Sequence, residues 1–220
     1  MKKLIVFDWD DVFTLGSKEG YFACYHQALE ELSVRLEPAE EHRRILEKWG
    51  QTHREELKEL LKEHPELLDR ACEIYEQKLF GDVFVKHLSI LPGTADFLAR
   101  LSQKYTLAIA TGMHGGLLRT RVMPHFGIPD VFAKILSAYD LPDPSLAKPH
   151  PLMLRMIMDE LGFPPADTVM VGDAKNDVLM AQAAHVEPIV VLTGHLDRVE
   201  AEALWVKNIV DDVTCIEGVL

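Results

Sequence analysis

Hydrophobic and polar positions divide the chain into two kinds of segment. Residues 3–7 form a short, uninterrupted apolar run, which is typical of a strand buried on both faces. Residues 20–80 instead repeat apolar positions at helical spacing, and the helix-starting residues Pro38, Thr52 and Pro65 divide this stretch into segments. The first 80 residues therefore predict one buried strand followed by a block of helices.

From residue 90 onward the pattern alternates between strands and helices. Short apolar runs predict strands within 106–111, 132–138, 168–173, 188–193 and 208–210. Helical patterns lie between them, within 94–105, 114–127, 150–162 and 176–185, with Gly162 placed to end its helix. This alternation predicts an α/β fold whose core is a Rossmann-like, doubly wound parallel sheet.

The helical block then reads as an insertion after the first strand. We assign residues 1–15 and 90–220 to the sheet-containing core and residues 16–89 to an inserted all-helical domain. The connections between the two, 14–17 and 86–91, are candidate hinges.

Composition narrows the class of protein. The 220 residues are 48% hydrophobic, enough for a sizeable core, and the formal net charge of −12 disfavours nucleic acid or an anionic membrane as a partner. No apolar run approaches the roughly 20 residues that span a bilayer, and the N-terminal apolar run is too short for a signal peptide. Three scattered cysteines fit a reducing compartment. We expect a cytoplasmic protein, and no partner protein is indicated.

Candidate chemistry lies where the predicted strands end. Asp8 and Asp10 follow the first strand, Thr111 and Gly112 close the strand at 106–111, and Asp173 ends the strand predicted at 168–173, with Asp177 four residues later. In open parallel sheets, ligands bind beyond the carboxyl ends of the strands. Carboxylates this close disfavour one another's ionised forms, so a positive group is expected among them.

The ordered set of short motifs resembles the haloacid dehalogenase-like hydrolases. The segments are "DWDDV" at 8–12, "ATG" at 110–112, "KPHP" at 148–151 and "VGDAKND" at 171–177. The stretch at 91–112 is similar to the phosphoglycolate-phosphatase-like branch, and the helical insertion sits where that branch carries its cap domain. The resemblance covers the whole core and implies a phosphatase acting on a small phosphorylated metabolite.

The resemblance also implies a role for each motif residue. Asp8 would be the nucleophile that forms an aspartyl phosphate, and Asp10 the general acid and base. Lys148 would offset the crowded carboxylates and contact the phosphoryl group. Thr111, with backbone N–H groups near Trp9, Asp10 and Gly112, would hold phosphoryl oxygens.

A Mg²⁺ cofactor follows from the same resemblance. The side chains of Asp8 and Asp173 and the backbone carbonyl of Asp10 would hold the ion, and Asp177 would ligate it or orient a bound water. The carboxylate at position 10 favours phosphoryl transfer, because members that expel halide generally lack one there.

Other interpretations stay open at this point. A phosphosugar mutase similar to β-phosphoglucomutase would use the same core, and a catalytically silent binding or regulatory protein would use the same fold. The Trp9 ring either packs on substrate or lies in the core. Asp11 reads more readily as a turn residue than as a catalytic one, and His195 as a surface residue or one with satisfied hydrogen bonds.

Overall fold

The computed structural model describes residues 2–49 and 52–220, which form two compact units. The first unit contains Met1–Leu15 and Ser89–Leu220, and the second contains Gly16–Leu88. We call them the sheet unit and the helical unit. Residues 1, 50 and 51 belong to the ranges assigned above but lie outside the described residues.

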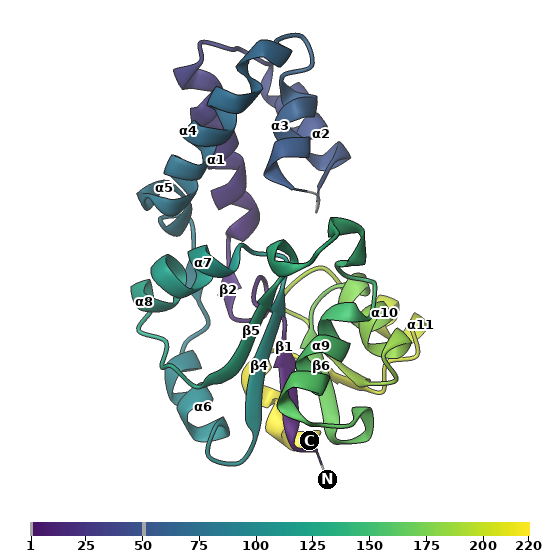
Figure 1. Cartoon of the computed structure of the whole chain (residues 1–220). Coiled ribbons are helices and arrows are strands. Elements are labelled where there is room, and N and C mark those ends of the chain that lie inside the picture. The colour runs from purple at the N-terminus through teal and green to yellow at the C-terminus, as the bar shows by residue number, and fades with distance from the viewer. Residues whose placement is uncertain (1, 50–51) are drawn as a thin grey trace. The chain divides into compact units, whose positions relative to one another are not determined.

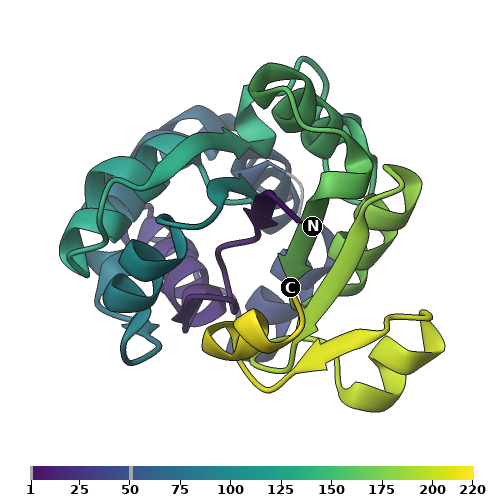
Figure 2. The ribbon, with the colours of Figure 1, turned by 90° about the horizontal axis from the view of Figure 1, so that it is seen from below.

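The sheet unit is built on one parallel sheet (Figure 1). In spatial order its strands are β5 (Phe132–Ser137), β4 (Thr106–Thr111), β1 (Leu4–Phe7), β6 (Thr168–Gly172), β7 (Glu187–Val191) and β8 (Asn208–Val210). Every neighbouring pair is parallel. Seen from below, the purple β1 lies between the teal and the green strands, and the yellow β8 forms an edge (Figure 2). The α/β class and the parallel sheet are therefore confirmed.

Helices connect these strands. They are α6 (Thr94–Leu101), α7 (Gly115–Leu117), a π-helical turn (Leu118–Val122), α8 (Met123–His125), α9 (Leu152–Leu161), α10 (Lys175–Ala183) and α11 (Arg198–Ala203). Short 3₁₀ segments occur at Ala138–Asp140, Pro144–Leu146, Pro165–Asp167 and Val213–Gly218. The predicted helix end at Gly162 is confirmed, because this residue caps α9 in the left-handed region with φ of 74°.

Burial on both faces explains why β1 is apolar throughout. All four of its residues are fully buried. Leu4 and Val6 belong to one hydrophobic cluster with Ile157 of α9 and Met180 of α10. Phe7 points to the opposite face by strand alternation and contacts the Phe13 ring at 5.0 Å between centroids. The core thus fixes β1 in the middle of the sheet and leaves its carboxyl end free for polar residues.

The two predicted hinges carry a small ribbon that the sequence pattern did not predict. Strands β2 (Thr14–Leu15) and β3 (Ser89–Ile90) pair antiparallel, with Leu15 opposite Ser89. The helical unit therefore ends at Leu88, one residue before the predicted boundary, because Ser89 is held by strand pairing in the sheet unit.

The helical unit contains α1 (Ser17–Glu31), α2 (Pro38–Glu47), α3 (His53–Leu60), α4 (Leu68–Phe80) and α5 (Asp82–Val85), with a 3₁₀ turn at Pro65–Leu67. Its core includes the stacked rings of Tyr25 and Tyr75, whose centroids lie 4.3 Å apart. Pro38 and Pro65 occupy first-turn positions of their helices, as predicted. In the described part of the chain, no helix is both long and apolar enough to cross a membrane.

Candidate active site

The register of the sheet brings two predicted strand ends together. Phe7 of β1 pairs with Val171 of β6, and the backbone N–H of Asp8 donates to the Val171 carbonyl at 2.8 Å. Asp173 comes directly after β6. Because both strands end at the same edge, their terminal carboxylates meet there.

Three carboxylates converge at this edge. Asp8, Asp173 and Asp177 each offer an oxygen, and these oxygens all lie within 4.8 Å of one another. Asp177 stands in the first turn of α10, where its carboxylate accepts the backbone N–H of Ala174 at 3.2 Å. A Cβ on Gly172 would lie 2.5 Å from the Asp177 Cβ, so the absence of a side chain at residue 172 admits Asp177 to the group.

Lys148 supplies the positive charge that the crowded carboxylates require. Its Nζ lies 2.8 Å from Asp8 Oδ1 and 2.8 Å from Asp177 Oδ1, and its side chain is 11% exposed. Burial lowers the pKa of Lys148, but the Asp177 and Asp8 carboxylates outweigh burial and raise that pKa overall. Lys148 therefore stays an ammonium between two carboxylates.

One ammonium does not balance three carboxylates. Burial raises the pKa of Asp8 to about 7; Lys148 opposes this shift, and the charges of Asp177 and Asp173 add to it. Burial also raises the pKa of Asp173 to about 7, with the Asp177 charge adding to the shift and the His195 N–H opposing it. The group carries more negative charge than its protein neighbours offset.

This imbalance fits a bound divalent cation. Three buried or nearly buried carboxylates, two just after β1 and β6 and one on α10, form a hard oxygen donor set, which is what Mg²⁺ and similar ions prefer. Desolvated carboxylates are costly unless they are paired or coordinate a metal. The residues present therefore fit the metal.

Asp10 and Trp9 lie in a tight turn after β1. Phe13 N–H donates to the Trp9 carbonyl at 3.0 Å, and Asp11 N–H donates to the Thr14 carbonyl at 2.7 Å. The Asp10 side chain is partly buried and is not among the three clustered carboxylates. The Trp9 N–H donates to Asp8 Oδ1 at 2.7 Å.

The Trp9 side chain lies in the core. It is fully buried, and its ring centroid lies 5.1 Å from that of Phe13 and 6.4 Å from that of Phe132. Of the two interpretations of this ring, the structure therefore supports core packing and not contact with substrate. The Trp9 backbone N–H donates to Asp8 Oδ1, so in a phosphate-binding role it would exchange that acceptor for a phosphoryl oxygen.

Thr111 and Gly112 lie at the end of the neighbouring strand. Ile109 of β4 pairs with Phe7, so Thr111, the last residue of β4, reaches the same edge as Asp8. The buried Thr111 hydroxyl oxygen accepts the Met113 N–H at 3.0 Å, which keeps its O–H available as a donor. A Cβ on Gly112 would meet no heavy atom within 4 Å, so the backbone at this residue is open.

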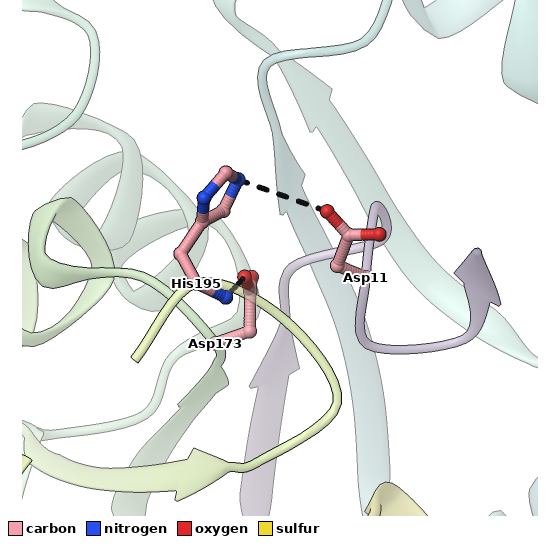
Figure 3. Close-up of side chains that lie close together, drawn as sticks. All are labelled: Asp11, Asp173 and His195. Atoms are coloured by element: carbon pink, nitrogen blue, oxygen red, sulfur yellow. Dashed lines mark hydrogen bonds and ion pairs between the residues drawn. The ribbon is translucent and has the colours of Figure 1, made fainter. Parts of the chain in front are cut away.

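Two residues set aside by the sequence analysis also lie here. Asp11, Asp173 and His195 place ligand-type atoms within 4.8 Å of one another (Figure 3). His195 Nε2 lies 3.7 Å from Asp11 Oδ2, and the His195 backbone N–H donates to Asp173 Oδ2 at 2.9 Å. The reading of Asp11 as a turn residue agrees with its φ of 55°. The His195 ring is 60% exposed, as expected for a surface residue, but the backbone N–H of His195 contacts a carboxylate of the group.

The sequence is similar to known phosphatases. The family model described as haloacid dehalogenase-like hydrolase matches residues 2–185. A Dickeya dadantii protein named "Probable phosphatase IndB" is 30% identical over 99% of this chain and 93% of its own length. A phosphoglycolate phosphatase from Haemophilus influenzae is 32% identical over 106 residues, which are 48% of this chain and 46% of that protein. The chain thus spans about half the length of this second relative.

Solved structures share the fold at lower sequence identity. The structure of CbbY from Rhodobacter sphaeroides in complex with phosphate has a TM-score of 0.77 at 22% identity, covering 98% of this chain and 96% of that one. A haloacid dehalogenase-like family hydrolase from Streptococcus pneumoniae has a TM-score of 0.69 at 18% identity, covering 96% and 94%. These similarities establish the fold of the chain.

Proposed function

The chain belongs to the haloacid dehalogenase-like hydrolases and is a phosphatase, and from this premise we propose that it hydrolyses the phosphate monoester of a small metabolite through an aspartyl phosphate on Asp8, with Mg²⁺ as cofactor. The observation that carries this proposal is the ion-paired group at the sheet edge. Lys148 Nζ lies 2.8 Å from Asp8 Oδ1 and from Asp177 Oδ1, and Asp173 completes the carboxylates.

In the proposed reaction an Asp8 carboxylate oxygen attacks phosphorus. The new oxygen–phosphorus bond forms while the bond from phosphorus to the ester oxygen breaks. Asp10 donates a proton to the leaving oxygen, which departs as an alcohol. Asp10 then takes a proton from a water molecule as that water attacks phosphorus, so that inorganic phosphate leaves and Asp8 is restored.

The remaining residues hold the phosphoryl group and offset its charge. Lys148 neutralises negative charge on Asp8 and on the phosphoryl oxygens. The Thr111 hydroxyl and the backbone N–H groups of Trp9, Asp10 and Gly112 donate to those oxygens. Positioning and electrostatic stabilisation are most of what phosphoryl transfer requires of a protein.

The proposed metal ligands are the side chains of Asp8 and Asp173 and the backbone carbonyl of Asp10. Asp177 either binds the ion or orients one of its waters. When bound, Mg²⁺ neutralises the charge that develops on the phosphoryl oxygens. The clustered oxygens of Asp8, Asp173 and Asp177 support this assignment.

The helical unit, 16–88, is proposed to act as the cap that selects the substrate. We propose a small phosphate monoester as substrate because the relatives include proteins named phosphoglycolate phosphatase. A phosphate-release screen over sugar phosphates, nucleotides, phosphoglycolate and phospho-amino acids would identify it. Release of free phosphate supports hydrolysis, whereas an isomerised sugar phosphate would indicate a mutase.

The first test removes the nucleophile. Asp8→Asn keeps the size of the side chain but replaces its carboxylate with an amide, so hydrolysis of p-nitrophenyl phosphate with Mg²⁺ should fall by at least about 10⁴-fold, as expected when a covalent catalyst is lost. Asp159→Asn is the matched control, because Asp159 lies on the exposed side of α9. Full activity of the Asp8 variant would exclude Asp8 as the nucleophile.

A further inference from the structure

A loop after β7 contacts two segments that carry proposed metal ligands. The loop is Thr193–Leu196, which we call the clamp loop. Thr193 Oγ1 donates to the backbone carbonyl of Asp11 at 2.5 Å. At the other end, the His195 N–H donates to Asp173 Oδ2 at 2.9 Å, and the Leu196 N–H donates to the Asp173 backbone carbonyl at 2.9 Å.

The clamp loop thus bonds to Asp173 at both its side chain and its backbone. A carboxylate fixed at one oxygen and at its own backbone has little freedom to rotate. The bond from Thr193 to Asp11 links residues 182 positions apart and reaches the turn that follows Asp8 and contains Asp10. Figure 3 shows His195 beside Asp173 and facing Asp11, with dashed lines to both.

Gly194 packs so closely against Asp173 that there is no room for a side chain at this position. An ideal Cβ on Gly194 would overlap the Asp173 carboxylate and would lie 2.6 Å from the Asp173 Cβ. No positive φ accompanies this glycine, so its backbone conformation suits other residues. Glycine is therefore required here by the proximity of Asp173 and not by backbone strain.

We infer that the clamp loop positions Asp173 for metal binding, with Thr193 and Gly194 as positioning residues that contact neither metal nor substrate. This inference rests on the proposed function, because it takes Asp173 as a metal ligand. Groups that orient metal ligands typically change metal affinity 10- to 100-fold when they are removed. The His195 ring is 60% exposed and 3.7 Å from Asp11, and such exposed ion pairs stabilise little. His195 therefore positions Asp173 through its backbone N–H and not through its ring.

The test measures Mn²⁺ binding to the full chain by electron paramagnetic resonance, with no substrate present. Thr193→Val keeps the shape of the side chain but removes its donor, and it should weaken Mn²⁺ binding about 10-fold. Thr193→Ser keeps the hydroxyl and should bind Mn²⁺ within about twofold of the unmodified chain. Gly194→Ala should show the larger loss, about 100-fold, because the Asp173 carboxylate must move. If the Gly194 variant fails to fold, the two Thr193 variants decide.

The matched control is Thr168→Val. Thr168 is buried, and its Oγ1 donates to the Pro164 carbonyl at 3.0 Å at the start of β6, the opposite end from Asp173. This variant also loses one hydroxyl bond to a backbone carbonyl, and it should bind Mn²⁺ as the unmodified chain does. His195→Ala should weaken binding by at most about threefold, because the backbone N–H remains.

The outcomes separate the inference from the proposed function. Equal Mn²⁺ affinity in Thr193→Val and the unmodified chain would overturn the inference. An unmodified chain that binds no Mn²⁺ would overturn both the inference and the proposed cofactor. A chain that binds Mn²⁺ but hydrolyses no phosphate ester would contradict the proposed function, and the variant affinities would still decide the inference.

Discussion

Buried charge is treated differently in the two units of this protein. Among the described residues of the sheet unit, the carboxylates of Asp8, Asp173 and Asp177 lie beside the ammonium of Lys148. In the helical unit, buried Arg44 is matched by Glu40 and Glu63, with nitrogen–oxygen distances of 2.7 and 2.6 Å. A buried charge whose opposite charges reach solvent serves the fold, whereas several buried charges of one sign indicate a place for a ligand.

The two units also differ in how far apart in sequence their ion-pair partners lie. Arg44 and Glu40 are four residues apart on α2, so this pair forms with its own helix. Lys148 and Asp8 are brought together by the sheet. Local pairs stabilise the element that carries them. Distant pairs form only in the folded state, so they depend on the whole unit.

Among the changes that test this comparison, removal of the Lys148 ammonium is expected to have the largest effect. Lys148→Met keeps the side-chain length but leaves the carboxylates without their ammonium, so kcat for p-nitrophenyl phosphate should fall about 100- to 1,000-fold. Steady-state kinetics at saturating Mg²⁺ would measure this. The matched control is Lys134→Met on β5. It also removes an ammonium, whose Nζ lies 2.6 Å from Glu160 Oε2. A similar loss of kcat in both variants would contradict the special role of Lys148.

The second change removes a buried hydrogen bond in the helical unit. The Tyr25 hydroxyl donates to the buried Glu56 carboxylate, and the two groups are 31 residues apart. Tyr25→Phe leaves that carboxylate without this donor and should lower the free energy of unfolding by about 1–3 kcal/mol. Urea denaturation would measure it.

A double-mutant cycle with Glu56→Gln tests whether this loss belongs to the Tyr25–Glu56 contact. Additive losses in the cycle would show that the hydroxyl and the carboxylate do not interact. A fall in kcat per folded molecule in Tyr25→Phe would contradict a purely structural role for this pair.

The smallest effect is expected from a change that relieves backbone strain without altering the charges of the carboxylate group. α10 carries Asp177 in its first turn and is followed by His185, an exposed residue with φ of 59°. His185→Gly should raise the free energy of unfolding by about 1 kcal/mol, because glycine adopts this conformation without the penalty on Cβ. The reverse control is Gly162→Ala after α9, with φ of 74° and open space around it, which should lower stability by a similar amount.

Unchanged kcat in both glycine variants is expected, since neither residue faces the carboxylate group. A stability change of the same sign in the two variants would contradict the strain argument.

The sequence predicted the main elements because their patterns are long or well bounded. β1, β4 and β6 are apolar runs closed by polar residues, and the helices of the helical unit have clear spacing and starting residues. The ribbon of β2 and β3 has two residues in each strand, too few for an alternating pattern to be recognised. Helix α11 has six residues and gave no periodic signal.

The residues of the site were predictable to the extent that they follow strands. Asp8, Asp173 and Lys148 were expected near one sheet edge, and the structure brings them together with Asp177. The clamp loop was not predicted, because Gly194 matters only through its distance from Asp173, which sequence spacing does not encode. The roles of these residues in catalysis stay predictions that the variants above test.

The pairing of β2 with β3 has a consequence for how the sequence of this protein can evolve. Leu15 lies opposite Ser89, so the outgoing and returning ends of the intervening 73 residues are neighbours. A stretch with adjacent ends can be lengthened, shortened or exchanged as one piece, while the strands that carry the acidic residues keep their order. The helical unit can therefore vary in sequence and length independently of the residues at the sheet edge.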